Sequence, residues 1–198
     1  MGDTRDREVV RCACRGDATA SRVKTVLPPL YHGARLVDFD ERLQGAAAHW
    51  LGNPAYGLLL LGSAGVGKTY FAAAIARALV ESGKTVIFRS AADYYADLRA
   101  TFNTSDADMS EGAVLTRLTD VEFLVLDDIG AGSLSDHERR STLHLLDRRI
   151  NHLRPTIITS NLTVDEIGRA MDERIASRLN GFTAIALTGR DRRRRARE

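Results

Sequence analysis

Two absences limit what this chain of 198 residues can be. No apolar run approaches the ~18 residues that a helix needs to span a bilayer. Residues 1–11 are highly charged and contain no signal-peptide core. The sequence therefore predicts a cytoplasmic protein and argues against a membrane-spanning or secreted one.

Cysteine is also scarce, and the chain has only Cys12 and Cys14. Disulfides are rare in the cytoplasm. A C-x-C pair can be half of a zinc site, but a structural zinc ion needs four ligands, and the only other Cys or His nearby is His32. We therefore expect two free thiols and no bound zinc.

The rest of the composition is ordinary. Hydrophobic residues make up 44% and charged residues 27% of the chain, as is usual for a soluble globular protein. One domain of this length buries about 70% of its unfolded surface without disulfides. The formal charge is only +2, but arginines gather near the C-terminus, at positions 190, 192–195 and 197. That segment is either a solvated tail or an arm that contacts phosphates.

Residues 62–69 read Gly-Ser-Ala-Gly-Val-Gly-Lys-Thr and fit the phosphate-loop pattern G-x-x-x-x-G-K-[ST]. A short apolar segment, 57–61, precedes them, and residues 70–82 repeat apolar side chains with a helical period. A strand before the loop and a helix after it are the setting that such a loop requires, so a chance match is the weaker interpretation. The sequence predicts binding of ATP or a close relative.

Each part of the loop has a predicted task. The glycines let the backbone bend so that its N–H groups point at phosphate oxygens, and the start of the next helix adds a positive end. Lys68 is expected to reach the β- and γ-phosphates, and the Thr69 hydroxyl is expected to bind Mg²⁺. The predicted nucleotide contacts are Gly62, Ser63, Ala64, Gly65, Val66, Gly67, Lys68, Thr69 and Tyr70.

A second apolar run, 123–126, is followed by Asp127 and Asp128. Carboxylates at the carboxyl end of a strand face the crevice where ligands of open α/β sheets bind. Asp127 is expected to hold Mg²⁺. Asp128 is expected to orient and deprotonate the attacking water, because phosphoryl transfer depends on positioning and charge neutralisation. Without the phosphate loop, two acids that merely end a strand would be the better interpretation.

Asn161 follows another predicted strand, 155–160. It should lie beside the two carboxylates if that strand is the neighbour of both other strands. A side-chain amide in that place can hold the lytic water or the γ-phosphate. A turn-forming asparagine is the alternative.

Arg174 and Arg178 are four residues apart and therefore share one face of a helix. One interpretation is a surface of ion pairs with Asp172 and Glu173. The other is an arginine finger offered to the ATP of a neighbouring subunit. The residues alone do not decide between the two.

Strand and helix patterns alternate along the chain. Apolar and β-branched segments predict strands at 57–61, 84–89, 121–126, 155–160 and 182–187. Helical periodicity predicts helices at 36–50, 70–82, 91–102, 113–118 and 135–152, with helical segments from 163 to 180. Capping boxes begin at Ser135 and Thr163. This alternation predicts an α/β fold with a parallel sheet covered by helices.

Four segments together resemble the AAA+ ATPases of the DnaC/IstB type, which are replicative helicase loaders and transposition helper ATPases. The segments are 62–69, 123–130 (FLVLDDIG), 154–162 (RPTIITSNL) and 173–179 (ERIASRL). They occur in the family's order and spacing, and the resemblance covers about residues 30–190. We therefore expect a charged leader with at most a short helix at 1–30, an AAA+ ATPase domain at 31–189 and an arginine-rich tail at 190–198.

The resemblance implies a P-loop core with a five-stranded parallel sheet in the order 5-1-4-3-2 and no C-terminal lid domain. It implies binding of Mg-ATP and ATP-dependent assembly into a ring or spiral. It also places the first sensor at Asn161 and a finger arginine within 173–179, where Arg178 is favoured and Arg174 is its companion.

In loaders of this family, the helices after the second strand line the inner surface of the assembly and contact single-stranded DNA. Here these helices correspond to 91–118, with Tyr94, Tyr95, Arg99 and Arg117 as candidate DNA contacts. Such a surface needs aromatic stacking and neutralisation of the DNA backbone. For the two tyrosines, packing in the core is at least as good an interpretation.

Two features depart from the family pattern. Asp128 stands where many relatives carry Glu, and the shorter side chain is expected to slow hydrolysis, as suits an ATP-gated switch. Loaders also usually have a longer N-terminal region that grips the helicase, sometimes with a cysteine-rich zinc module. Here about thirty residues precede the core, and Cys12 and Cys14 look like the end of such a module.

The leading hypothesis is an ATP-dependent DNA-replication factor that hydrolyses ATP and loads or remodels a hexameric replicative helicase on single-stranded DNA. The alternative within the family is a transposition helper that acts on duplex target DNA. An ATP-binding adaptor that hardly hydrolyses ATP is a third hypothesis. A small P-loop kinase is disfavoured, because nothing between the second and fourth strands resembles a substrate pocket with a basic lid.

Overall fold

The computed structural model of the protein describes residues 13–54, 57–103 and 110–189. Its centre is a five-stranded sheet in which every pair of neighbours is parallel, in the order β2-β3-β4-β1-β5. This order confirms the predicted arrangement 5-1-4-3-2. The strands are β1 (Gly57–Leu61), β2 (Val86–Ser90), β3 (Phe123–Ile129), β4 (Thr156–Ser160) and β5 (Thr183–Ala186).

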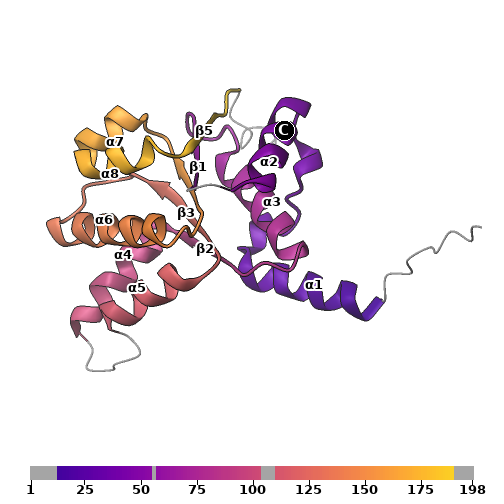
Figure 1. Cartoon of the computed structure of the whole chain (residues 1–198), viewed down its shortest axis with the longest axis horizontal. Helices are drawn as coiled ribbons and strands as arrows, with labels where there is room; N and C mark the ends of the chain where they lie inside the picture. Colours follow the sequence, from indigo (N-terminus) through magenta and orange to yellow (C-terminus); the bar gives the residue numbers. More distant parts are fainter. Residues whose placement is uncertain (1–12, 55–56, 104–109, 190–198) are drawn as a thin grey trace, which may run out of the picture.

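Helices connect the strands and cover both faces of the sheet (Figure 1). The helices are α1 (Ala13–Val26), α2 (Glu41–Gly52), α3 (Lys68–Glu81), α4 (Ala91–Ala100), α5 (Glu111–Asp120), α6 (Asp136–Asn151), α7 (Val164–Ala170) and α8 (Glu173–Leu179). Three short 3-10 turns are η1 (Pro29–Tyr31), η2 (Leu36–Asp38) and η3 (Thr101–Asn103). No helix of the described ranges is long and apolar enough to cross a membrane.

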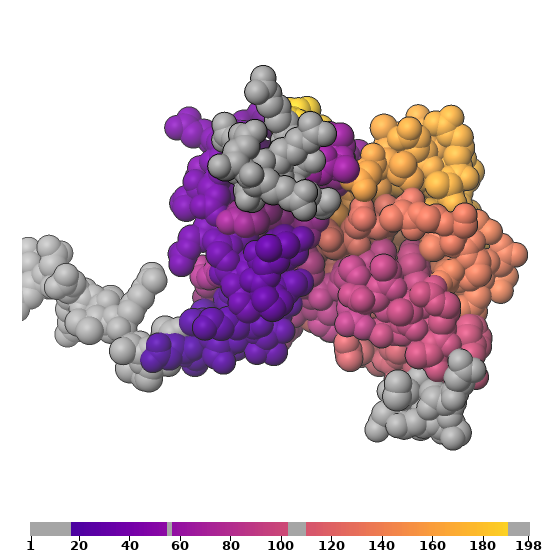
Figure 2. Space-filling model, turned by 180° about the vertical axis from the view of Figure 1, so that it is seen from behind, coloured from indigo at the N-terminus to yellow at the C-terminus, as the bar shows by residue number. Residues whose placement is uncertain are grey.

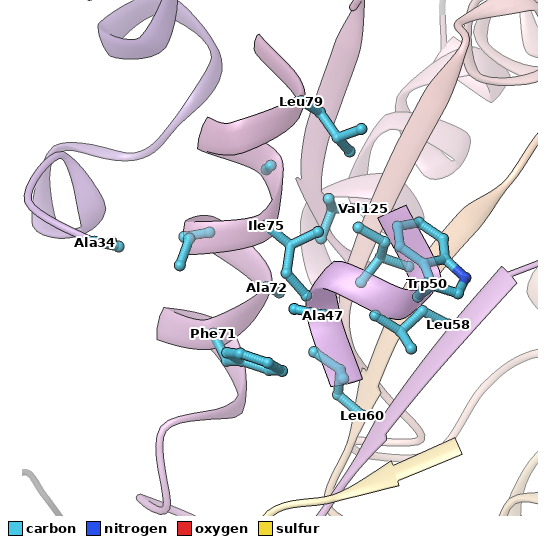
Figure 3. Close-up of a cluster of buried hydrophobic side chains, with 14 of the residues drawn as sticks. Ala34, Ala47, Trp50, Leu58, Leu60, Phe71, Ala72, Ile75, Leu79 and Val125 are labelled. Atoms are coloured by element: carbon cyan, nitrogen blue, oxygen red, sulfur yellow. The ribbon is translucent and has the colours of Figure 1, made fainter. Parts of the chain in front are cut away.

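Alternation along the strands divides the core in two, because successive side chains of a strand point to opposite faces. Leu58 and Leu60 belong to one hydrophobic cluster, with residues of α1, α2 and α3. Leu59 belongs to the other cluster, with residues of α4 to α8. Figure 3 shows part of the first cluster, where Trp50 packs near Leu58 and its indole Nε1 donates a hydrogen bond to the carbonyl of Gly57 at 3.2 Å.

The two groups of helices also separate on the surface. Seen from behind, the indigo N-terminal helices lie on one side, and the orange and yellow C-terminal helices lie on the other (Figure 2). The sheet therefore forms the middle layer of a three-layer α/β/α arrangement.

The N-terminal region is more structured than the sequence suggests. Helix α1 has 14 residues, whereas at most a short helix is expected there. Val23 and Leu27 are both only 2% exposed and join the core cluster on the α3 side of the sheet. These two apolar residues are four apart in an otherwise polar stretch, so the sequence pattern alone is weak. The domain boundary near residue 30 stays a prediction.

The structure also tests the predicted helix starts. The predicted helix 36–50 is broken, because Asp40 caps α2 by accepting a hydrogen bond from the Leu43 N–H at 2.9 Å, which leaves η2 as a separate turn. The predicted capping boxes at Ser135 and Thr163 are both present. Cys12, the side chain of Cys14 and the arginine-rich segment 190–198 lie outside the described residues.

Candidate nucleotide site

The loop between β1 and α3 takes a conformation that requires its glycines. Gly62, Gly65 and Gly67 have φ angles of 153°, 81° and 104°, which other residues rarely adopt. A Cβ atom on Gly62 would also lie 2.2 Å from the carbonyl oxygen of Leu187. Gly67 immediately precedes α3, so the loop leads its backbone directly to the positive end of that helix.

Lys68 is held inside the loop by three oxygen atoms that accept hydrogen bonds from it. Its ammonium group donates hydrogen bonds to the carbonyls of Gly62 at 2.8 Å and Ser63 at 3.0 Å, and to Oδ1 of Asn161 at 2.5 Å. Only 6% of Lys68 is exposed. The ammonium group is therefore desolvated and fixed in position, which strengthens its attraction for an anion.

Asp127 lies at the centre of the predicted magnesium site. Its Oδ2 accepts a hydrogen bond from the Thr69 hydroxyl at 3.2 Å, and its Oδ1 accepts one from the Thr159 hydroxyl at 2.7 Å. Burial raises the pKa of the Asp127 carboxyl above its ordinary value, although both hydroxyls lower it. A buried carboxylate beside a threonine hydroxyl fits Mg²⁺, which binds hard oxygen ligands and usually keeps phosphate oxygens and waters as well.

Asp128 points into the same crevice as Asp127 because the strand is irregular at this point. The pairing of β3 with β4 shifts between Leu126 and Ile129, and Asp128 has a φ of 61°. Neighbouring side chains of a regular strand would face opposite sides of the sheet. A non-glycine residue in this conformation is uncommon and often marks a functional site.

Asn161 and Thr159 connect the parts of the site. The Asn161 amide donates through Nδ2 to Oδ1 of Asp128 at 2.8 Å, while its oxygen accepts from Lys68. Thr159, at the end of β4, accepts from the N–H of Asp128 at 2.8 Å and donates to Asp127. The structure thus brings Asn161 beside the carboxylates, as expected from its place after β4.

A cavity of about 750 Å³, a size typical of a site for a small molecule, is lined by Lys68, Thr69, Asp127, Asp128 and Asn161. Three lining residues were not anticipated from the sequence, namely Leu30, Tyr31 and Asp38. They come from the turns η1 and η2, which pack against α3 near the loop. Leu30 and Tyr31 directly follow Pro28-Pro29, but no local pattern marks them or Asp38 as lining residues.

Asp38 is tied to the far end of the phosphate loop. Its Oδ2 accepts hydrogen bonds from the Tyr70 hydroxyl at 2.9 Å and from the Arg35 N–H at 2.9 Å. This contact joins the N-terminal turns to α3. With Leu30 and Tyr31, Asp38 gives part of the cavity a mixed apolar and polar lining, which suits a base and ribose.

The two candidate finger arginines do not line this cavity. Arg174 makes a bidentate pair with Asp172, with Nε–Oδ1 at 3.1 Å and Nη2–Oδ2 at 2.9 Å. Arg178 donates from Nε to Oδ1 of Asp147 on α6 at 2.5 Å. The ion-pair interpretation therefore holds for Asp172.

The candidate DNA contacts fall into two groups. Tyr94 and Tyr95 are 0% and 5% exposed and pack in the core cluster on the α6 side. A buried ring offers no face to a base, so the expectation of stacking is wrong for these two residues. Arg99 and Arg117 are exposed, and Arg99 forms an ion pair with Glu138 on α6. These two arginines stay candidates.

Residues 37–179 match a protein family described as IstB-like ATP binding protein. The replicative helicase loader DnaC of Escherichia coli K12 is 34% identical over 118 residues, which are 60% of this chain and 47% of the loader. An ATP-binding protein of insertion sequence IS1162 from Pseudomonas fluorescens is 32% identical over 172 residues, which are 82% of this chain and 71% of that protein.

Among solved structures, the crystal structure of the DnaC helicase loader is similar with a TM-score of 0.71 and 23% identity, over 81% of this chain and 100% of that chain. This likeness shows the AAA+ fold. The chain spans about half the length of the curated helicase loaders that it matches.

Proposed function

Because the chain belongs to the IstB-like ATP binding protein family, we propose that it is a Mg-ATP-dependent ATPase that loads or remodels a hexameric replicative helicase on single-stranded DNA. The observation that carries the ATPase activity is the hydrogen-bonded arrangement of Lys68, Asn161 and Asp128 beside the Asp127–Thr69 pair. The identity to helicase loaders supports the choice of partner.

The phosphates of ATP would replace the internal partners of Lys68. The ammonium group would leave the carbonyls of Gly62 and Ser63 for the β- and γ-phosphate oxygens, and the loop N–H groups would point at the same oxygens. Mg²⁺ bound by Thr69 and Asp127 would neutralise charge that develops on the phosphates.

The protein itself would position the water. Asp128 lies within hydrogen-bond reach of the Asn161 amide, and both line the cavity. Asp128 would accept the proton of the attacking water, while Asn161 would hold the water or the γ-phosphate in line. An aspartate reaches less far than a glutamate, so we expect slow turnover.

The arrangement of Arg174 and Arg178 supports an assembled enzyme. Both are outside the cavity of their own chain, at exposed positions on α8, where 64% of the Arg174 side chain and 40% of the Arg178 side chain are accessible. An arginine finger supplied by a neighbouring subunit needs that placement. We therefore propose ATP-dependent self-association, with Arg178 as the finger.

A second function within the family is a transposition helper that acts on duplex DNA. The observation that favours it is the longer match to the ATP-binding protein of IS1162, which covers 82% of this chain, compared with 60% for the E. coli loader. The nucleotide site would do the same chemistry in either case. The DNA that stimulates it distinguishes the two functions.

Helicase loading can be tested with a hexameric replicative helicase of the host, supplied with single-stranded circular DNA coated by a single-strand-binding protein and a fork substrate. We expect the wild type with ATP to start unwinding and the Lys68→Ala variant to be inactive. Equal unwinding with and without the protein would contradict the loader function, while leaving ATP hydrolysis to be judged by itself.

A further inference from the structure

The outer surface of α6 carries a row of basic side chains that the nucleotide site does not use. Arg140, His144, Arg148 and His152 follow one another at intervals of four residues. Side chains four apart on a helix lie one above the other, about 6 Å apart along the axis. Arg140, His144 and His152 are exposed and Arg148 is half-buried. We name these four residues the basic row.

The basic row lacks acidic partners in the part of the chain that the structure describes. Two acids near it on α6 are engaged elsewhere, since Asp136 pairs with Arg139 and Asp147 pairs with Arg178. The other ion pairs of α6 in that part of the chain also lie off the row. Within the described ranges, no ion pair therefore neutralises Arg140 or Arg148.

One carboxylate, Glu111 of α5, faces the row from the neighbouring helix. It accepts hydrogen bonds from Ser141 at 2.6 Å and from His137 at 3.0 Å. Burial opposes its ionisation, but these bonds and the nearby His137 and His144 lower its pKa overall. The Glu111 oxygens thus already accept hydrogen bonds from α6, and this carboxylate lies close to only part of the basic row.

The helix dipole explains only half of the row. Basic groups in the last turn of a helix or at its C-cap are favoured by its negative end; Arg148 lies in the last turn of α6, and His152 is its C-cap. The effect fades within one turn. Arg140 and His144 lie further from the end of α6, so their place in the row needs another reason.

The row continues the surface already considered for DNA. Helix α6 lies beside α4 and α5 (Figure 1), and Arg99 of α4 reaches across to Glu138 of α6. A nucleic-acid strand that contacts Arg99 can therefore continue onto the side of α6 that faces α5. Arg140 and Arg148 place two permanent charges about 12 Å apart along the axis of α6, and the imidazoles of His144 and His152 add hydrogen-bond donors beside them, so the row can contact several phosphates of one nucleic-acid strand.

We infer that the basic row binds the phosphate backbone of a nucleic-acid strand and extends the DNA path from α4 along α6. This inference rests on the proposed DNA-binding function. The contact is with phosphates rather than bases, so it positions the strand and carries no sequence preference. It also predicts that DNA binding depends on α6, outside the segment 91–118.

The test compares two variants that lose the same charge. Arg140→Gln/Arg148→Gln removes two positive charges from the row. Lys24→Gln/Arg169→Gln removes two from exposed positions on α1 and α7 and serves as the matched control. Affinity for a fluorescent oligothymidine and for a duplex of equal length is measured between 50 and 300 mM salt, with ATP affinity and circular dichroism as folding checks.

We expect the row variant to bind single strands at least tenfold more weakly than the wild type at the lowest salt. The slope of log affinity against log salt should become shallower by about 1.4, because each lost phosphate contact on a single strand contributes about 0.7 to its magnitude. The control variant should change affinity less than threefold. If the double variant folds poorly, Arg140→Gln alone should lower the slope by about 0.7.

The outcomes separate the inference from the function on which it rests. A wild type that binds neither single strands nor duplex contradicts the proposed function, and the basic row then has no nucleic-acid ligand. A wild type that binds DNA, with a row variant that matches the control variant, overturns the inference alone. If the row variant loses affinity only for duplex, the basic row is still a phosphate contact, and the result favours the transposition helper.

Discussion

The polar atoms of the nucleotide site form one connected chain of hydrogen bonds. Lys68 donates to Asn161, Asn161 donates to Asp128, and Thr159 links the backbone of Asp128 to the carboxylate of Asp127. Asp127 and Asp128 come from the end of β3, Thr159 and Asn161 from the end of β4, and Lys68 from the start of α3. The catalytic geometry at the scale of single residues is therefore set by hydroxyl and amide groups as much as by the charged ones.

The role of Asp128 is tested by Asp128→Asn. The variant keeps an oxygen that can accept the hydrogen bond from Asn161, so nucleotide affinity should stay within about twofold of the wild type. Turnover should fall by about 10²–10⁴, the usual contribution of a general base. Steady-state phosphate release and fluorescent-nucleotide binding measure the two effects, and unchanged turnover would place the base on another residue.

Thr159 is expected to be a positioning residue for both carboxylates. It is fully buried, and its single hydroxyl serves Asp127 and Asp128 at once. Thr159→Val keeps the shape but removes the hydroxyl, so we expect turnover to fall at least tenfold and the Mg²⁺ requirement to rise. Thr159→Ser should restore both, and a valine variant with normal Mg²⁺ dependence would show that the hydroxyl only supports the fold.

The raised pKa of Asp127 makes a prediction about stability. Burial raises this pKa, so between its ordinary and raised values the folded chain holds a proton that the unfolded chain has lost. The free energy of unfolding without Mg²⁺ should therefore fall as pH rises through that window. Urea unfolding at a series of pH values should show this fall in the wild type and not in Asp127→Asn. The same pH slope in both proteins would mean that another group titrates.

Much of the site is predictable from the sequence because its residues occupy defined places. Lys68 and Thr69 belong to a loop of fixed spacing, while Asp127 and Asn161 follow apolar strands whose ends meet in a parallel sheet. Thr159 was hidden, since a threonine inside a β-branched run also fits the core of a strand. Leu30 and Asp38 reach the cavity only through packing of the N-terminal turns, which no local pattern encodes.

At the scale of secondary-structure elements, α6 connects distant parts of the fold through one buried cation. The Arg149 side chain is fully buried, and burial lowers its pKa to about 9. Its guanidinium donates to one hydroxyl and five backbone carbonyls. The acceptors are Thr156 Oγ1 and the carbonyls of Leu118, Thr119, Val121, Glu122 and Pro155.

These contacts join α6 to the connection before β3 and to the start of β4. Arg149→Ala would leave several buried carbonyls without donors, each costing about 1–3 kcal/mol unless water reaches it. We expect a loss of about 3–5 kcal/mol in the free energy of unfolding. Denaturant unfolding measures it, with the adjacent Arg148→Ala as control, which should stay within about 0.5 kcal/mol. Equal losses in both variants would contradict the account of the buried cation.

The helices and strands are predictable from the sequence, whereas the surroundings of their individual side chains are less so. Strong apolar runs and helical periods give the five strands and the main helices, because burial dictates those patterns. The same periods cannot tell which side of a helix faces a partner. Tyr94 and Tyr95 therefore suited both the core and a DNA surface, and only the packing of α4 on β3 shows that they are buried.

At the scale of the whole molecule, the proposed assembly would complete each cavity with an arginine from the neighbouring subunit. Arg178 donates a hydrogen bond to Asp147 of α6 and does not line the cavity of its own chain. Arg178→Ala should therefore leave ATP affinity intact and lower turnover by about 10³ or more. When mixed with Lys68→Ala, it should regain part of the activity through interfaces that combine a normal cavity with a normal finger.

Phosphate release from a titration of the two inactive variants measures this complementation. Activity should pass through a maximum at intermediate ratios and be absent at either end. A Lys68→Ala and Lys68→Ala/Arg178→Ala mixture is the control, because it contains no functional cavity. Absence of any maximum would mean that Arg178 does not act between subunits.

The most direct test of the central claim is ATP hydrolysis measured without DNA, with single-stranded DNA and with duplex DNA, at one fixed salt concentration. The proposed loader should hydrolyse ATP slowly alone and several times faster with single strands, and Lys68→Ala should show no activity in any condition. A rate that responds only to duplex would contradict the loader and support the transposition helper. Hydrolysis that is absent under all three conditions would contradict the ATPase mechanism itself.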